Sequence, residues 1–178
     1  MRRIRPVAAV LSLAFAAGCA PPRPVTAPLP ACAPAPASTA GWETKTEPFF
    51  AVRIPPGLRY AIVRGIDSAP RTYTGRGLRI SYETGPYSGP SLGPGENDLD
   101  YVECTTMIGG VEAHVASWNT PGGGFMLHAA WRRIAPAGPF GDTNLGIWIR
   151  TRSSDPQSLA IAHAIIHSVR FPSPPPQP

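Results

Sequence analysis

YVECTTMIGGVEAHVASW, residues 101–118, is the stretch of sequence that decides the fold. Residues 101–107 and 111–118 are two runs rich in β-branched and aromatic side chains, and Gly109-Gly110 lies between them. A Gly-Gly pair between two such runs is typical of a tight β-hairpin, because both glycines adopt the backbone conformation that the turn needs. The stretch therefore predicts two antiparallel strands joined by a short turn.

Similar strand patterns occur on both sides of this hairpin. Apolar residues alternate at Phe50, Val52 and Ile54 until Pro55-Pro56-Gly57 ends the run. Leu78, Ile80 and Tyr82 alternate in the same way and place Arg79 and Ser81 on the other face. Further strands are expected at residues 60–66, 125–134 and 144–151.

Only the end of the chain predicts a helix. Ser154 or Asp155 can cap it, Pro156 suits its first turn, and an apolar stripe follows at Leu159, Ala162, Ile166 and Val169. Hairpin-linked strands followed by a single helix indicate an α+β fold. We expect an antiparallel sheet of about six or seven strands with one C-terminal amphipathic helix packed on one face.

The first residues have the layout of an export signal. Arg2, Arg3 and Arg5 precede an apolar run at residues 7–17, which ends in Gly18-Cys19. As a helix, this run would cover about 16 Å, which is too short for roughly 30 Å of hydrocarbon. Residues 1–18 are therefore expected to be a cleaved signal peptide.

Residues Ala16-Ala17-Gly18-Cys19 resemble the bacterial lipobox, with Ala16 where leucine is usual. The resemblance implies cleavage before Cys19 and a lipid on its sulfur, hence a membrane anchor in the bacterial cell envelope. Ala20 replaces the Asp that signals inner-membrane retention, so the resemblance favours the outer membrane, facing the periplasm, in a cell with two membranes. The alternative is an ordinary secreted protein in which Cys19 has no such role.

The rest of the chain divides by composition. Residues 19–41 are expected to be the lipidated cysteine and an extended tether, since fourteen of the twenty-one residues at 20–40 are Pro or Ala. At about 3.1 Å per residue, those residues would reach roughly 65 Å. Residues 42–171 form one sheet domain, and the Pro-rich residues 172–178 are expected to be a disordered tail.

Charge argues against a nucleic-acid partner. The whole chain carries a formal charge of +5, but loss of residues 1–18 leaves thirteen basic and eleven acidic side chains. The arginines are scattered along the sequence, whereas a nucleic-acid binder needs a concentrated basic surface. We expect no nucleic acid among the partners of this protein.

The cysteines other than Cys19 form an even pair. Cys32 and Cys104 could form a disulfide in an oxidising compartment, and this bond would fasten the end of the tether to the sheet. Two free thiols, or a bond between molecules through Cys32, are the alternatives that the sequence leaves open.

The histidines offer two weak metal-like pairs. His163 and His167 are four residues apart on the expected helix, but Ala164 stands where the HExxH zinc motif needs Glu. His114 and His128 would face each other if the hairpin between them were symmetric. Two ligands do not make a metal site, so we expect no metal, no cofactor and no catalytic residue.

A loop rich in glycine and proline at residues 85–100 is the strongest candidate for recognition. Tyr82, Tyr87 and Tyr101 lie in or beside it, and exposed tyrosines suit contact with a protein or glycan. The alternative is that these rings pack back over the edge of the sheet.

The opening strand ending in Pro-Pro-Gly, the Gly-Gly hairpin and the Asp-led helix running into Ser168-Val-Arg-Phe171 resemble the PsbP-like fold. That group includes small bacterial lipoproteins. No second long helix is evident here for the other face of the sheet.

The favoured function is a non-enzymatic envelope lipoprotein that binds or scaffolds a periplasmic protein or a cell-wall partner. An accessory lipoprotein of an envelope assembly or secretion machine is the alternative. A metal-dependent hydrolase built from one histidine pair with Glu112 or Asp142 is the least favoured.

Overall fold

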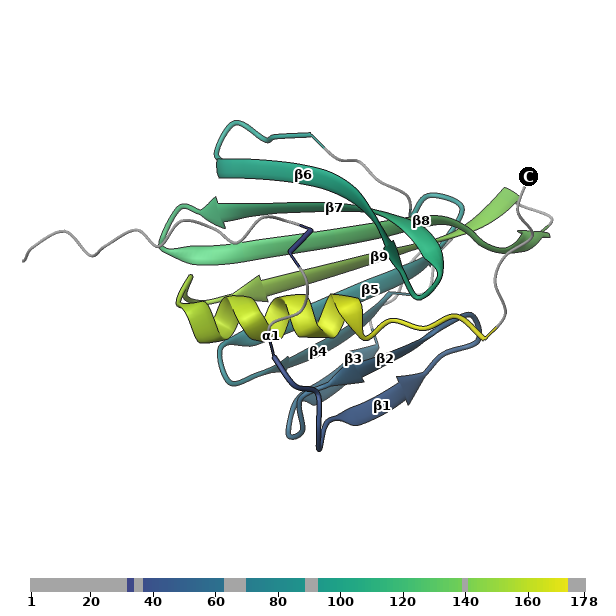
Figure 1. Ribbon diagram of the computed structural model, residues 1–178, viewed down its shortest axis with the longest axis horizontal. Helices are drawn as coiled ribbons and strands as arrows, with labels where there is room; N and C mark the ends of the chain where they lie inside the picture. Colours follow the sequence, from purple (N-terminus) through teal and green to yellow (C-terminus); the bar gives the residue numbers. More distant parts are fainter. Residues whose placement is uncertain (1–31, 34–36, 63–69, 89–92, 139–140, 173–178) are drawn as a thin grey trace, which may run out of the picture.

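The computed structural model, which describes residues 32–33, 37–62, 70–88, 93–138 and 141–172, contains a seven-stranded antiparallel sheet (Figure 1). Its strands lie in the spatial order β3-β4-β5-β9-β8-β7-β6. Their bounds are β3 Arg59–Ile62, β4 Arg71–Gly75, β5 Leu78–Gly85, β6 Leu99–Ile108, β7 Val111–Thr120, β8 Gly124–Gly138 and β9 Gly141–Thr151.

The hairpin predicted at residues 101–118 is present. β6 pairs with β7, and Ile108 faces Val111 across a turn in which Gly109 and Gly110 have φ values of 65° and 83°. A Cβ atom on Gly109 would lie 2.8 Å from the backbone oxygen of Val169. Glycine is needed there both for the left-handed backbone and for this close approach.

A second, two-stranded sheet is formed by β1 (Glu43–Thr46) and β2 (Ala51–Ile54). β2 is the alternating run that the sequence predicts, whereas β1 and β4 are strands that the sequence analysis missed. The strand expected at residues 60–66 corresponds to β3 as far as Ile62, and residues 63–66 lie outside the described residues. The expected fold class, an antiparallel sheet with one C-terminal helix, is confirmed.

The helix α1 spans Pro156–His167 and begins as the sequence predicts. The Asp155 carboxylate accepts a hydrogen bond from the backbone N–H of Ser158 at 3.0 Å, which is the usual N-cap interaction. Hydrogen bonds from Ser153 and Ser158 lower the pKa of Asp155 to about 2. Within the described residues, no helix is long and apolar enough to span a bilayer.

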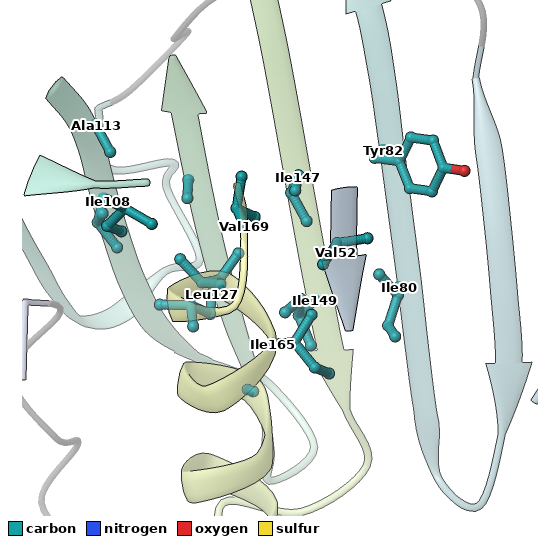
Figure 2. Packing of buried hydrophobic residues seen from close by; sticks show 14 of the residues in the cluster. Val52, Ile80, Tyr82, Ile108, Ala113, Leu127, Ile147, Ile149, Ile165 and Val169 are labelled. Carbon is teal, nitrogen blue, oxygen red and sulfur yellow. The ribbon is translucent and has the colours of Figure 1, made fainter. Parts of the chain in front are cut away.

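One face of the large sheet carries the hydrophobic core. α1 packs on β8 and β9, and Figure 2 shows Ile165 beside Ile149, whose partner on β8 is Leu127. The β1–β2 hairpin covers the neighbouring part of the same face, where Val52 lies over Ile80. Burying one such aliphatic side chain contributes about 1.5–3 kcal/mol, so these two elements hold the sheet together.

The segment before β1 completes this covering layer. A disulfide joins Cys32 to Cys104 of β6, with a Cα–Cα distance of 6.0 Å. The Ala33 backbone hydrogen-bonds to His167 at the end of α1, and Thr39 accepts a hydrogen bond from Arg53 at 3.0 Å. The sequence predicts an extended tether over residues 19–41 and leaves the bond of Cys32 open. In the structure, Cys32, Ala33 and Thr39 already contact the domain.

Loss of this disulfide is expected to destabilise the domain strongly. The bond closes a loop with a sequence separation of 72 residues, and the chain-entropy relation gives a loss of about 4 kcal/mol for such a loop. Cys32→Ser and Cys32→Ser/Cys104→Ser should lower the free energy of unfolding by the same amount in urea titrations. Cys19→Ser is the matched control, because it removes a cysteine and leaves the bond. Unchanged stability in both variants would contradict the structure.

Candidate functional site on the outer sheet face

The alternation of side chains along the strands gives the large sheet two different faces. The inner face carries the core, as at Ile80 and Ile149, which are paired neighbours on β5 and β9. Along each strand, the residues that alternate with these inner ones point to the outer face, away from α1. No described helix or strand packs on this outer face, so its side chains are candidates for binding.

Three arginines and one threonine form a row across four strands of the outer face. In the strand register, Arg59 of β3 lies opposite Thr74 of β4, Thr74 opposite Arg79 of β5, and Arg79 opposite Arg150 of β9. All four side chains are exposed. The side chains of Arg79 and Arg150 therefore start about 5 Å apart, with like charges in directly opposed positions.

This row lines a cleft of about 750 Å³ at the end of the sheet where the β4–β5 and β7–β8 turns lie. Arg76 and Arg152 complete a set of five arginines around it, and the described lining contains no Asp or Glu. We call this feature the arginine cleft: Arg59, Arg76, Arg79, Arg150 and Arg152. Its volume is in the range of small-molecule sites, about 300–1,000 Å³.

The two turn arginines, Arg76 and Arg152, lie close to glycines. A Cβ atom on Gly57 would be 3.6 Å from the guanidinium of Arg76, and one on Gly77 would be 3.8 Å from the Arg152 side chain. The ion pairs of the described chain are Lys45–Glu43, Arg133–Asp142 and a longer His114–Glu112 contact. None of them involves the arginine cleft, so its five charges are not neutralised by described carboxylates.

Aromatic side chains lie beside the arginine cleft on the same face. Trp118 of β7 packs against Tyr101 with ring centroids 5.9 Å apart, and His128 stacks on Trp148 at 4.6 Å. Burial lowers the pKa of His128 to about 4, so this ring is neutral near pH 7. A Cβ atom on Gly146 would lie 2.5 Å from the Trp148 ring, so glycine makes room for this stack.

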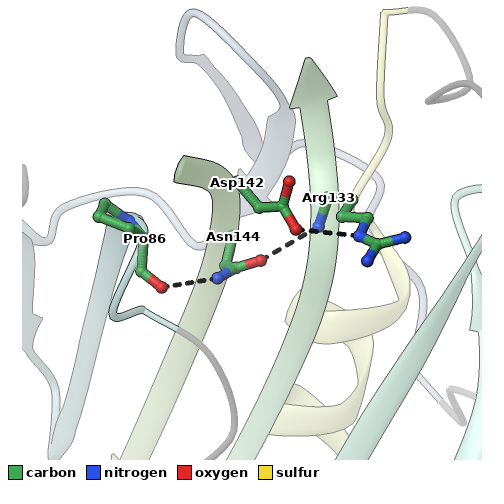
Figure 3. A network of polar contacts seen from close by, with 4 residues as sticks. All are labelled: Pro86, Arg133, Asp142 and Asn144. Carbon is green, nitrogen blue, oxygen red and sulfur yellow. Dashed lines mark hydrogen bonds and ion pairs between the residues drawn. The ribbon is translucent and has the colours of Figure 1, made fainter. Parts of the chain in front are cut away.

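The connection from β5 to β6 begins against the same face. The backbone oxygen of Ser88 lies above Gly146, and Ser88 is buried. Asn144 donates a hydrogen bond to the Pro86 carbonyl at 2.8 Å and accepts one from the Arg133 backbone N–H at 3.1 Å (Figure 3). Arg133 also pairs with Asp142 at 2.9 Å, so this network fixes the start of the connection.

The three tyrosines proposed for recognition do not form one surface, which corrects that hypothesis. Tyr82 is buried on the inner face, where it packs against Phe50 at 5.2 Å and donates a hydrogen bond to Glu47. Tyr101 is half-buried on the outer face against Trp118. Tyr87 alone is widely exposed, at 79%.

The histidine pair on β7 and β8 is also not arranged as predicted. His114 lies opposite Ala130, and His128 lies opposite Ala116, so the two rings are diagonal neighbours. The hairpin is centred on Gly122, one residue later than a direct pairing of the two histidines requires. His114 lies 3.9 Å from Glu112 and is half-exposed, whereas His128 is buried.

His163 of α1 belongs to the buried side of the helix. Its side chain is fully buried. The centroid of its ring lies 6.4 Å from that of the Phe125 ring and 6.5 Å from that of the His167 ring. Neither of its ring nitrogens has a hydrogen-bond partner among the described residues. Burial, with a smaller contribution from His167, lowers the pKa of His163 to about 4.

The structure brings no metal site together within its described ranges. No group of three or more His, Cys, Asp or Glu side chains is placed there to hold a metal ion. Asp142, one of the acids considered for a hydrolase, is paired with Arg133. Cys19 lies outside the described residues.

No family model matches the sequence, and a search of curated proteins finds no significant match.

The arginine cleft is the feature that the sequence analysis missed, because its arginines come from three separate segments. The alternation along this strand gave a weak signal of the cleft, because it places Arg79 on the face of the sheet opposite to Leu78 and Ile80.

The buried His163 makes stability depend on pH. Its pKa is about 4 in the folded chain and about 6.5 in an unfolded one, so the unfolded chain binds the proton more readily. The free energy of unfolding should therefore fall as the pH drops from about 6.5 to about 4, by about 2–3 kcal/mol from this residue. Urea titrations of His163→Leu at pH 4.5 and pH 7 should show a smaller pH difference than the unmodified chain.

The half-exposed His114 provides the control for this measurement, and His114→Gln should keep the full pH difference. An unchanged pH difference in His163→Leu would contradict the assignment of the effect to this buried ring.

Proposed function

We propose that this protein is a lipid-anchored lipoprotein of the bacterial envelope whose sheet domain binds a partner through its outer face. The observation that carries the proposal is the Cys32–Cys104 disulfide. Disulfides of this kind persist in oxidising compartments outside the cytoplasm, which agrees with the export signal expected at residues 1–18. The bond supports export, and the lipobox-like Cys19 supports the anchor.

The disulfide also changes the expected geometry of the anchor. Cys32 is fastened to β6, so only residues 20–31 separate the lipidated cysteine from the domain. A chain of this length spans at most roughly 45 Å even when fully extended. The domain would therefore be held nearer to the membrane than a tether up to residue 41 implies.

The contrast between the two sheet faces supports a binding role. The inner face is covered by α1, the β1–β2 hairpin and the segment that Cys32 ties down. The outer face instead presents five arginines and half-buried aromatic rings. Arginine and aromatic side chains are enriched in binding surfaces, because they combine large contact area with directed polar groups.

Anchoring at Cys19 is tested in cells. The unmodified chain should fractionate with membranes and shift in gel mobility after globomycin treatment, which blocks cleavage of lipidated precursors. Cys19→Ala should lose membrane association, because several acyl chains at about 0.8 kcal/mol per buried CH₂ provide it.

Thr26→Ala is the control, since it changes a residue of the tether, leaves Cys19 and the Cys32–Cys104 bond in place, and should leave membrane association intact. Soluble behaviour of the unmodified chain, or unchanged fractionation of Cys19→Ala, would contradict the proposed anchor.

A further inference from the structure

We propose that the arginine cleft binds a ligand that carries two or more phosphate groups. This inference deepens the proposed binding role of the outer face and rests on it. It concerns the chemistry of one end of that face, where Arg59, Arg79 and Arg150 share a row with Thr74.

The charge of the cleft points to an anion. Five guanidinium groups surround it, and no described carboxylate lines it or pairs with them. The rest of the mature chain is acidic, with eight basic and eleven acidic side chains. An arginine-rich composition can explain how many arginines the chain has. It does not explain why five of them line one cleft in an otherwise acidic protein.

The pairing of Arg79 with Arg150 favours phosphate over carboxylate. Like charges in directly opposed strand positions repel each other, so this arrangement is unfavourable without a bound anion. One guanidinium fork already satisfies the two oxygens of a carboxylate. A phosphate group presents three oxygens and up to two charges, so it can accept hydrogen bonds from both arginines at once.

The length of the row indicates more than one phosphate. Adjacent strands lie about 4.8 Å apart, so the row from Arg59 to Arg150 spans about 14 Å across β3, β4, β5 and β9. A single phosphate group can contact only one part of it. The Thr74 hydroxyl, between Arg59 and Arg79, adds a neutral donor to the middle of the row.

The test is a calorimetric titration of the full-length protein, purified in neutral detergent from whichever fraction contains it. The probes are pyrophosphate, inorganic phosphate and citrate at pH 7 and low ionic strength. Pyrophosphate should bind at least tenfold more tightly than inorganic phosphate and citrate, and its affinity should fall with added salt. Citrate binding as tight as pyrophosphate, or the absence of pyrophosphate binding, would overturn the proposal.

The variant Arg79→Gln/Arg150→Gln should weaken pyrophosphate binding at least tenfold. Its matched control is Arg71→Gln/Arg132→Gln, which removes two positive charges outside the cleft and should change the affinity less than twofold. An equal loss in both variants would overturn the proposal, because it would show a general effect of net charge.

Folding of the variant is checked by its melting temperature without ligand. Removal of the opposed charges should leave this temperature unchanged or raise it, while the stabilisation by pyrophosphate is lost. If Arg79→Gln/Arg150→Gln does not fold, Arg59→Gln, at the edge of the row, serves as the second variant. Retention of full pyrophosphate affinity by Arg59→Gln would then overturn the proposal.

Lipid vesicles are then tested as competitors for bound pyrophosphate, to find the source of the phosphates. The protein used is the Cys19→Ala variant, because it has no cysteine at which the lipid could be attached. Displacement of pyrophosphate by vesicles that contain cardiolipin, whose headgroup carries two phosphates, but not by phosphatidylcholine vesicles, supports the site with lipid headgroups as its source. Retention of pyrophosphate against both supports it with a soluble ligand. This variant also distinguishes failure of the proposed lipid anchor from failure of the proposed phosphate site. Pyrophosphate binding to it tests the arginine cleft alone, because the variant carries no anchor.

Discussion

The apolar inner face of the seven-stranded sheet is the constraint on which the rest of the structure depends. A helix of twelve residues covers β8 and β9 and leaves the strands on either side exposed. The β1–β2 hairpin covers one side, and the segment tied down by Cys32 reaches the other side at β6. Since exposed apolar surface of this extent would destabilise the fold, the disulfide and the N-terminal segment are parts of the domain and not only of its tether.

The same strand register produces both the core and the arginine cleft. Side chains alternate along a strand, so the pairing that places Ile80 beside Ile149 inside also places Arg79 beside Arg150 outside. A shift of one residue would reverse both, and the cost of exposing the isoleucines prevents it. The core therefore holds two like charges in opposed positions, and a bound anion would relieve their repulsion. This gives a physical reason why a site could form where the charges alone are unfavourable.

Local patterns predicted most of the strands, the central hairpin and the helix, because alternation, the Gly109-Gly110 turn and the Asp155 cap act between near neighbours. The pairing of β5 with β9 joins segments that are far apart in sequence, and no local signal specifies it. Arginines that look scattered along the chain therefore gather only in the folded sheet. For the same reason, Tyr82 could be mistaken for a surface residue, and the covering of β6 by residues near Cys32 was left open. The lipobox resemblance at Cys19 and the PsbP-like resemblance remain predictions.

The register of β5 and β9 is proposed to build a phosphate site on the outer face of the sheet. A crystal structure of the protein grown with pyrophosphate tests it most directly. We predict a phosphorus atom between the Arg79 and Arg150 guanidinium groups, with the second phosphate directed toward Thr74 and Arg59. Pyrophosphate bound elsewhere on the protein, with the arginine cleft empty, would contradict it.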